Sequence, residues 1–125
     1  MGPRGLTVAD LLVDTDVCID HLIGRARLSG RRSRLGYSVI TRAELLAGAS
    51  KRREDEQVRR LLAAMTEYPV DRQIADEAGR IRGQVGIRLP DALIAATALV
   101  HGLTLDTRNL ADFRRVPELR LRRRG

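Results

Sequence analysis

The sequence Leu11-Leu12-Val13-Asp14-Thr15-Asp16 joins a short apolar run to three polar residues. Three apolar residues bounded by polar ones are typical of a short buried strand. Asp and Thr are preferred at the start of a helix, where their side chains accept hydrogen bonds from free backbone N–H groups. The sequence therefore predicts a strand over 11–13 that ends at Asp14 and leads into a helix over 17–23.

The same order of strand and helix recurs along the chain. Residues 37–40 predict a second strand, and 41–48 predict the helix that follows it and stops at a glycine. Further short extended segments are predicted at 68–70, at 103–105 and, as an edge strand, at 119–121. Apolar residues at helical spacing predict the intervening helices: Val58, Leu61, Leu62 and Met65; Ile74, Ala78, Ile81 and Val85; and the largely apolar run 91–100. The alternation predicts an α/β fold with a small parallel sheet flanked by helices.

Composition narrows the class of protein. A chain of 125 residues is one domain's worth of sequence, for which we expect residues 1–10 to be an N-terminal extension and 120–125 a basic tail. Cys18 is the only cysteine, so an intramolecular disulfide and a cysteine-based zinc site are excluded. The longest nearly apolar run, 92–100, is about half of the ~20 residues that span a bilayer. With no recognisable signal peptide either, we expect a cytoplasmic protein without a membrane partner.

The positive charge is concentrated in two segments. Residues 24–36 carry five Arg and no acid, and residues 114–125 carry six Arg and one Glu. Because the whole chain has a net charge of +7, the remaining residues have a net charge of −3. This division favours a polyanionic partner, although a solvated Arg-rich surface would give the same pattern. With only three aromatic residues, stacking on bases is a minor means of recognition.

Four acids are predicted to meet at one edge of the sheet. Ligands of open α/β sheets bind beyond the carboxyl ends of the strands, where Asp14, Glu44, Asp91 and Asp112 are expected. Like charges placed together repel unless a cation neutralises them, and carboxylate oxygens suit Mg²⁺ or Mn²⁺.

Each acid also has an ordinary structural explanation. Thr41 and Glu44 match a capping box, and Asp91 after a proline is a normal acid in the first turn of a helix. Asp14 and Asn109 could be N-caps. The pattern alone leaves both readings open.

These residues lie in four blocks, 11–16, 39–48, 89–98 and 102–113, which together resemble the PIN-domain family and, within it, the VapC toxins of bacterial toxin–antitoxin pairs. The blocks follow the family's order, and the resemblance runs from about residue 11 to 121. It implies a single PIN domain with a small parallel sheet. It also implies an endoribonuclease dependent on Mg²⁺ or Mn²⁺ that hydrolyses RNA phosphodiesters, with transfer RNA and ribosomal RNA as plausible targets.

The resemblance also assigns site residues. The family's first three acids correspond to Asp14, Glu44 and Asp91, and its fourth acidic position is Asn109 here. We expect Asp112 to supply the missing charge, and Asp14 and Asp91 to hold the metal ion. Two hydroxyls, those of Thr15 and Thr107, are expected to orient carboxylates or water. RNA phosphates are expected to contact arginines of the basic segments: Arg25, Arg27, Arg31, Arg32, Arg114 and Arg115.

The resemblance further implies protein partners. VapC-like proteins are usually homodimers held inactive by a VapB-type antitoxin, whose C-terminal segment covers the acidic cleft. The helices over 41–49 and 58–66 are candidate contacts for such a segment.

Two other readings remain open from the sequence. Asp14-Thr15-Asp16-Val17 also fits the start of a haloacid-dehalogenase-type phosphatase, in which Asp14 would be the nucleophile. That family needs a lysine beyond the second strand, whereas Lys51 lies in a charged, helix-like run. A non-enzymatic alternative is a degenerate PIN domain that binds RNA or protein without cleavage, and Asn109 motivates it.

Overall fold

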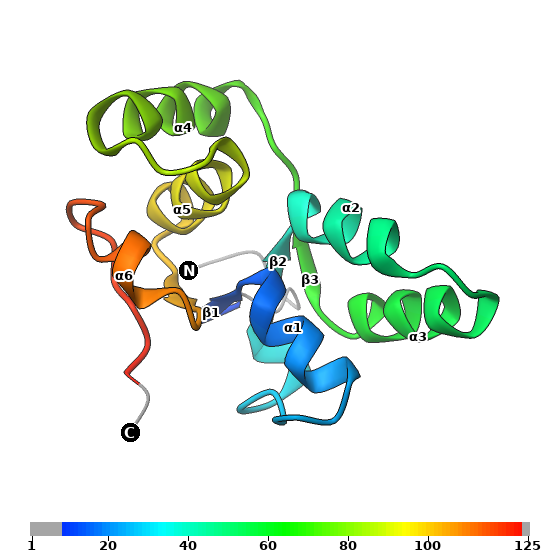
Figure 1. The fold of residues 1–125 in the computed structure, drawn as a ribbon. Helices are drawn as coiled ribbons and strands as arrows, with labels where there is room; N and C mark the ends of the chain where they lie inside the picture. The colour runs from blue at the N-terminus through cyan, green and yellow to red at the C-terminus, as the bar shows by residue number, and fades with distance from the viewer. Residues whose placement is uncertain (1–8, 124–125) are drawn as a thin grey trace, which may run out of the picture.

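The computed structural model describes residues 9–123, which fold around one parallel sheet with strand order β3-β2-β1-β4 (Figure 1). The strands are β1 Leu11–Val13, β2 Leu35–Ser38, β3 Thr66–Tyr68 and β4 Thr104–Asp106. The helices are α1 Thr15–Leu22, α2 Val39–Gly48, α3 Arg52–Ala63, α4 Arg72–Val85, α5 Leu89–His101 and α6 Leu110–Phe113, and a short 3-10 helix spans Arg32–Arg34. Every strand pair is parallel, which confirms the predicted α/β class. The expected N-terminal extension and basic tail lie partly outside the described residues, so those boundaries stay a prediction.

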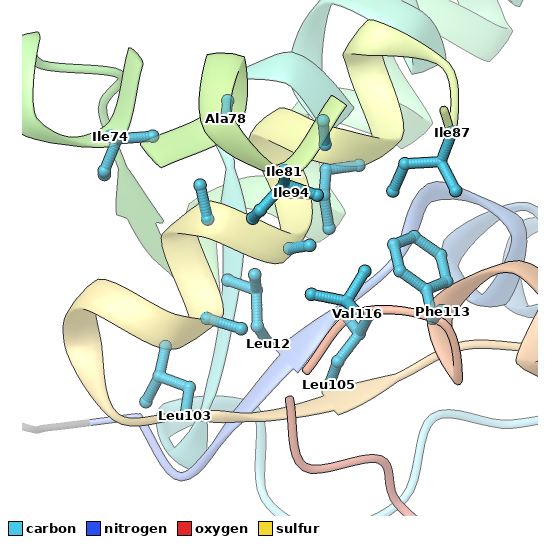
Figure 2. Close-up of a cluster of buried hydrophobic side chains, with 14 of the residues drawn as sticks. Leu12, Ile74, Ala78, Ile81, Ile87, Ile94, Leu103, Leu105, Phe113 and Val116 are labelled. Atoms are coloured by element: carbon cyan, nitrogen blue, oxygen red, sulfur yellow. The ribbon is translucent and has the colours of Figure 1, made fainter. Parts of the chain in front are cut away.

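Alternation along β1 divides the apolar core between the two faces of the sheet. Leu12 belongs to a buried cluster with residues of α4, α5 and α6, and Val13 belongs to a second cluster with residues of α1, α2 and α3. Figure 2 shows Leu12 and Leu105 on the face that α5 covers. Successive side chains of a strand point to opposite faces, so helices on both faces follow from the pattern. The predicted apolar helix is α5, whose buried residues are concentrated between Ala92 and Ala98.

The boundary between β2 and α2 differs from the prediction. The strand was expected over 37–40 and the helix from Thr41, but the strand ends at Ser38 and α2 begins at Val39. Ser38 causes the earlier start, because its hydroxyl accepts a hydrogen bond of 3.0 Å from the N–H of Ile40 and so caps the helix. Thr41 consequently lies inside α2, which excludes the alternative explanation of Thr41 and Glu44 as a capping box.

Two predicted extended segments also shift. The segment at 68–70 is a true strand of the sheet but covers 66–68, where it pairs with β2. The ring of Tyr68 packs over Gly36, and a Cβ atom at Gly36 would lie 2.5 Å from that ring. The predicted edge strand at 119–121 is only an isolated parallel bridge between Leu121 and Leu105. Among residues 9–123, no helix is long and apolar enough to span a membrane.

Candidate active site

All four predicted acids line one open cleft of about 300 Å³. The cleft lies at the carboxyl end of β1, between the first turns of α1, α5 and α6 and the middle of α2. Its lining residues are Asp14, Thr15, Asp16, Ile19, Glu44, Arg88, Asp91, Asn109 and Asp112. Parallel strands point their carboxyl ends toward the same edge, and this brings together side chains that are far apart in the chain.

Asp14 is the most buried acid of the cleft. It caps α1, and its Oδ1 accepts a hydrogen bond of 2.8 Å from the N–H of Thr15. Its Oδ2 accepts one of 2.7 Å from the hydroxyl of Thr107. Burial raises the pKa of Asp14 to about 7, the nearby charges of Asp16 and Asp91 add to the rise, and these two hydrogen bonds oppose it. Asp14 is therefore both a helix cap and a carboxylate held in an environment that disfavours its charge.

Glu44 is connected to α1 by a hydroxyl. The side chain of Thr15 donates a hydrogen bond of 2.7 Å to Oε1 of Glu44. The hydroxyl of Thr15 also lies 2.9 Å from the hydroxyl of Thr41. Glu44 thus reaches across to the start of α1 instead of capping its own helix, as the capping-box reading required.

Asp91 lies in the first turn of α5, three residues after the N-cap Arg88. Burial raises the pKa of Asp91, and the positive charge of Arg88, 3.9 Å away, opposes the rise. Three other carboxylates add to it: Glu44, Asp112 and Asp16. The structure therefore supports the first-turn reading of Asp91 and also places it among like charges, which the pattern alone had left as alternatives.

The segment between β4 and α6 is organised by Asn109. Its Oδ1 accepts from the N–H of Asp112 at 3.4 Å, and its Nδ2 donates to Oδ2 of Asp112 at 3.0 Å. Its own N–H donates to the hydroxyl of Thr107 at 3.0 Å. Asn109 is therefore the predicted N-cap, and it also holds the carboxylate of Asp112 in the cleft. An aspartate at 109 could accept the first of these bonds but could not donate the second.

Sequence reasoning did not select three charged residues of this region. Asp16 lines the cleft, and its carboxylate accepts from the N–H of Arg108 at 3.2 Å. Arg108 also pairs with the buried Asp20 at 3.0 Å, and Arg88 lines the cleft beside Asp91. The spacing Asp16-x-x-x-Asp20 places both acids on one face of α1, a signal that was available in the sequence.

The six arginines predicted to contact RNA do not line the cleft. Arg25, Arg27, Arg31 and Arg32 lie after α1, where Arg32 approaches His21 at 3.4 Å. Arg114 and Arg115 follow α6, and Arg115 donates to the carbonyl of Val85. Their role in RNA binding stays a prediction.

Some other arginines of the two basic segments form hydrogen bonds or ion pairs with residues distant in the sequence. Arg34 pairs with Asp10, and Arg120 donates to the carbonyl of Gly102 at 2.6 Å. Arg122 donates to the hydroxyl of Ser29 at 2.8 Å, which joins the two basic segments to each other.

The donor chemistry of the cleft fits a hard divalent cation. Carboxylate, amide and hydroxyl oxygens surround it, and the pKa values of both Asp14 and Asp91 are raised partly by neighbouring negative charge. A cation would relieve that repulsion. Within residues 9–123, no three His, Cys, Asp or Glu side chains form a ready-made metal centre. A cation held by one or two of these carboxylates would complete its coordination with water.

The family model of the PIN domain matches residues 11–119. The chain belongs to the PIN-domain family. This PIN domain is 41% identical to Ribonuclease VapC10 of Mycobacterium tuberculosis, in an alignment covering 82% of the chain and 85% of that relative. It is 30% identical to the tRNA(fMet)-specific endonuclease VapC of Salmonella typhimurium, with 88% and 94% covered.

Solved structures resemble this PIN domain over nearly its full length. A toxin–antitoxin complex from Klebsiella pneumoniae matches with a TM-score of 0.76 and 31% identity, covering 87% of this chain and 94% of the other. DNA-bound VapBC from Salmonella typhimurium matches with a TM-score of 0.80 and 27% identity, covering 91% and 97%. The phosphatase alternative gains no support, because Lys51 lies at the N-cap position of α3 and does not line the cleft.

Proposed function

We propose that this PIN domain is a divalent-metal-dependent endoribonuclease and the toxin component of a toxin–antitoxin pair. The observation that carries the proposal is the meeting of Asp14, Glu44, Asp91 and Asp112 in one cleft of a PIN fold. Two relatives, at 41% and 30% identity, are named as a ribonuclease and as a transfer-RNA endonuclease. We propose RNA as the substrate, in the form of transfer RNA or ribosomal RNA.

In the proposed mechanism the four acids have different roles. Asp14 and Asp91 would hold Mg²⁺ or Mn²⁺, with Glu44 and Asp112 completing the polar surroundings. When bound, the cation supplies an acidified water and neutralises charge that develops on the phosphodiester. Thr107 and the N–H of Thr15 each hold one oxygen of Asp14, which fixes the direction of its carboxylate.

Cation binding and proton loss are coupled at Asp14. With a pKa of about 7, Asp14 is only partly ionised at neutral pH in the metal-free protein. A metal ligand must be deprotonated, so binding expels the remaining proton and becomes tighter as pH rises. The acidic cleft would disfavour RNA in the metal-free protein, so the cation would strengthen substrate binding as well as support catalysis.

Arginines are proposed to bind the RNA backbone at two distances from the cleft. Arg88 lines the cleft and the N–H of Arg108 donates to Asp16 of the cleft, so we propose that both contact the phosphates next to the cleaved bond. Phosphates farther along the RNA would be bound by the arginines predicted from the sequence: Arg25, Arg27, Arg31, Arg32, Arg114 and Arg115. Neutralising phosphates releases counterions, so binding should weaken as salt rises.

An apolar groove beside the cleft is the proposed binding site for a segment of a VapB-type antitoxin. The groove has a volume of about 270 Å³ and is lined by residues of α1, α2 and α3, including the exposed Ile23. Ile19 and Glu44 line both the groove and the cleft. A segment seated in the groove would therefore reach the acids directly. The Klebsiella pneumoniae structure described above is a toxin–antitoxin complex, and the Salmonella typhimurium structure is of VapBC. The predicted homodimer remains part of the proposal.

The proposed function is tested by sequencing RNA ends after expression of the wild-type chain and of Asp14→Ala. We expect new 5′ ends to gather at a few positions in a stable RNA with the wild type only. Identical end profiles would contradict the proposal. If the wild type produces no new ends yet binds RNA, the degenerate PIN domain motivated by Asn109 becomes the better reading.

A further inference from the structure

Three side-chain oxygens form a line that crosses between two helices. The hydroxyl of Thr41, inside α2, lies 2.9 Å from the hydroxyl of Thr15 at the start of α1. The hydroxyl of Thr15 lies 2.7 Å from Oε1 of Glu44, which returns the line to α2. Thr41 is fully buried and does not line the cleft, so it cannot touch a substrate there.

The number of protons on the two hydroxyls determines which group donates in each of these hydrogen bonds. An ionised carboxylate can only accept hydrogen bonds, and each hydroxyl has a single proton to donate. The short contact between Thr15 and Glu44 therefore uses the one proton of Thr15. The contact between the two hydroxyls must then use the proton of Thr41. Thr41 donates to Thr15, and Thr15 donates to Glu44.

We propose that Thr41 is a positioning residue that fixes Glu44 through Thr15, an inference that rests on the proposed function of the cleft. By occupying a lone pair of Thr15, Thr41 directs the proton of Thr15 toward Glu44 and polarises that bond. Hydrogen bonds in a chain strengthen one another. Glu44 is partly exposed on its helix, and these two hydrogen bonds select the orientation in which its carboxylate lies in the cleft and acts on Asp91.

A comparison within the same molecule shows that Thr41 is not an ordinary buried threonine. Thr97, in α5, is equally buried, but its hydroxyl donates at 2.8 Å to the carbonyl of Leu93 one turn earlier. That local bond is how threonine usually satisfies its hydroxyl inside a helix. The hydroxyl of Thr41 instead reaches a neighbouring helix and a residue of the cleft. Thr97 is therefore a matched control for removal of a buried hydroxyl.

The test is a double-mutant cycle on the full chain, with Mn²⁺ affinity measured by titration and RNA cleavage measured as kcat and KM. We expect Thr41→Val to weaken Mn²⁺ binding by about fivefold, the size of one neutral hydrogen bond, and to lower kcat more than it raises KM. Thr41→Ser should restore both, because it keeps the hydroxyl. Thr97→Val should leave both unchanged even if it lowers the melting temperature equally.

The double-mutant cycle distinguishes a relay, in which Thr41 acts on Glu44 through Thr15, from independent effects of Thr41 and Thr15 on Mn²⁺ affinity. Because Thr41 acts only through Thr15, adding Thr41→Val to Thr15→Val should cause no further loss of Mn²⁺ affinity. Additive losses, or equal behaviour of Thr41→Val and Thr97→Val, would overturn the relay while leaving the proposed function intact. If the wild type neither binds Mn²⁺ nor cleaves RNA, the proposed function fails first and the relay fails with it.

Discussion

The hydroxyl of Thr107 donates a hydrogen bond of 2.7 Å to the carboxylate of Asp14, across 93 positions of sequence. Both side chains are buried, and they join the segment after β4 to the end of β1. This bond stabilises the charged form of Asp14 in a place where burial and two nearby carboxylates oppose that charge. The proposed cation site therefore depends on residues that come from both ends of the chain.

Thr107→Val should weaken Mn²⁺ binding at pH 7 by about tenfold or more, because hydrogen bonds to charged groups contribute roughly 1.5–3 kcal/mol. Loss of the bond also raises the pKa of Asp14 further, so the loss of affinity should shrink at pH 8.5. Titration of Mn²⁺ at both pH values checks this, with Thr107→Ser as the variant that keeps the hydroxyl. Equal Mn²⁺ affinities for the Val and Ser variants at pH 7 would contradict it.

The stability of the metal-free protein should depend on pH through Asp14. Its pKa is about 7 in the folded chain and 3.8 in the reference state, so the folded state holds a proton that the unfolded state loses as pH rises between these values. Folding stability from this group is therefore present below about pH 4 and lost as pH rises to about 7. Asp14→Asn cannot ionise and should lack this loss.

Urea unfolding of both proteins in EDTA measures the effect. The free energy of unfolding of Asp14→Asn relative to wild type should increase between pH 4 and pH 8 by a few kcal/mol. Added Mn²⁺ should stabilise the wild type at pH 8 and leave Asp14→Asn nearly unchanged. A relative stability that stays flat across this range would show that Asp14 is not perturbed as described.

Asn109→Asp should not increase RNA cleavage, although it restores an acid at the family's fourth position. The Nδ2 group of Asn109 donates to Asp112 at 3.0 Å, and a carboxylate there would face a second carboxylate instead. We expect the metal-free variant to lose about 1–2 kcal/mol of stability and to regain part of it when Mn²⁺ is added. Cleavage several times faster than wild type would show that Asn109 is a missing ligand and not a support for Asp112.

The basic segment after α1 is expected to bind RNA phosphates without taking part in cleavage. Replacing Arg25, Arg27 and Arg31 by Gln should reduce the slope of log affinity against log salt by about two, at ~0.7 for each phosphate contact on a single strand. Binding is measured with a short RNA in EDTA, so that no cleavage occurs. The charge-matched control replaces three arginines of α3: Arg52, Arg53 and Arg59. Equal slopes for both triple variants would remove the specific role of the first segment.

The sequence predicted the fold class and the four acids because both depend on local pattern. Short apolar runs that end in Asp14 and Asp106 identify strands, and parallel strands necessarily share an edge. The start of α2 was misplaced because Ser38 and Thr41 are both good N-caps, and only the structure shows which hydroxyl caps the helix. The capping-box explanation of Glu44 failed for the same reason.

The contacts between distant segments could not be predicted from the local sequence pattern. No spacing rule connects Thr15 to Glu44 or Arg108 to Asp20, because these pairs depend on how α1 packs against α2 and on the path of the chain after β4. The position of Asp16 at the start of a helix explains it from local pattern alone, whereas the structure places it in the lining of the cleft. Likewise, charge counting could not separate the arginines that tie the chain together, such as Arg122, from those available to a partner.

The central claim is that Asp14 and Asp91 hold the cation on which RNA cleavage depends. It is tested most directly by incubating a defined RNA with purified wild type, Asp14→Asn, Asp91→Asn and the control Asp76→Asn, which alters an exposed acid of α4 outside the cleft. Each protein is assayed with Mg²⁺, with Mn²⁺ and with EDTA, and its melting temperature is recorded. We predict that wild type and Asp76→Asn cleave only with a divalent cation, and that both cleft variants stay folded but do not cleave. Full cleavage by both cleft variants, or cleavage by wild type in EDTA, would contradict the account.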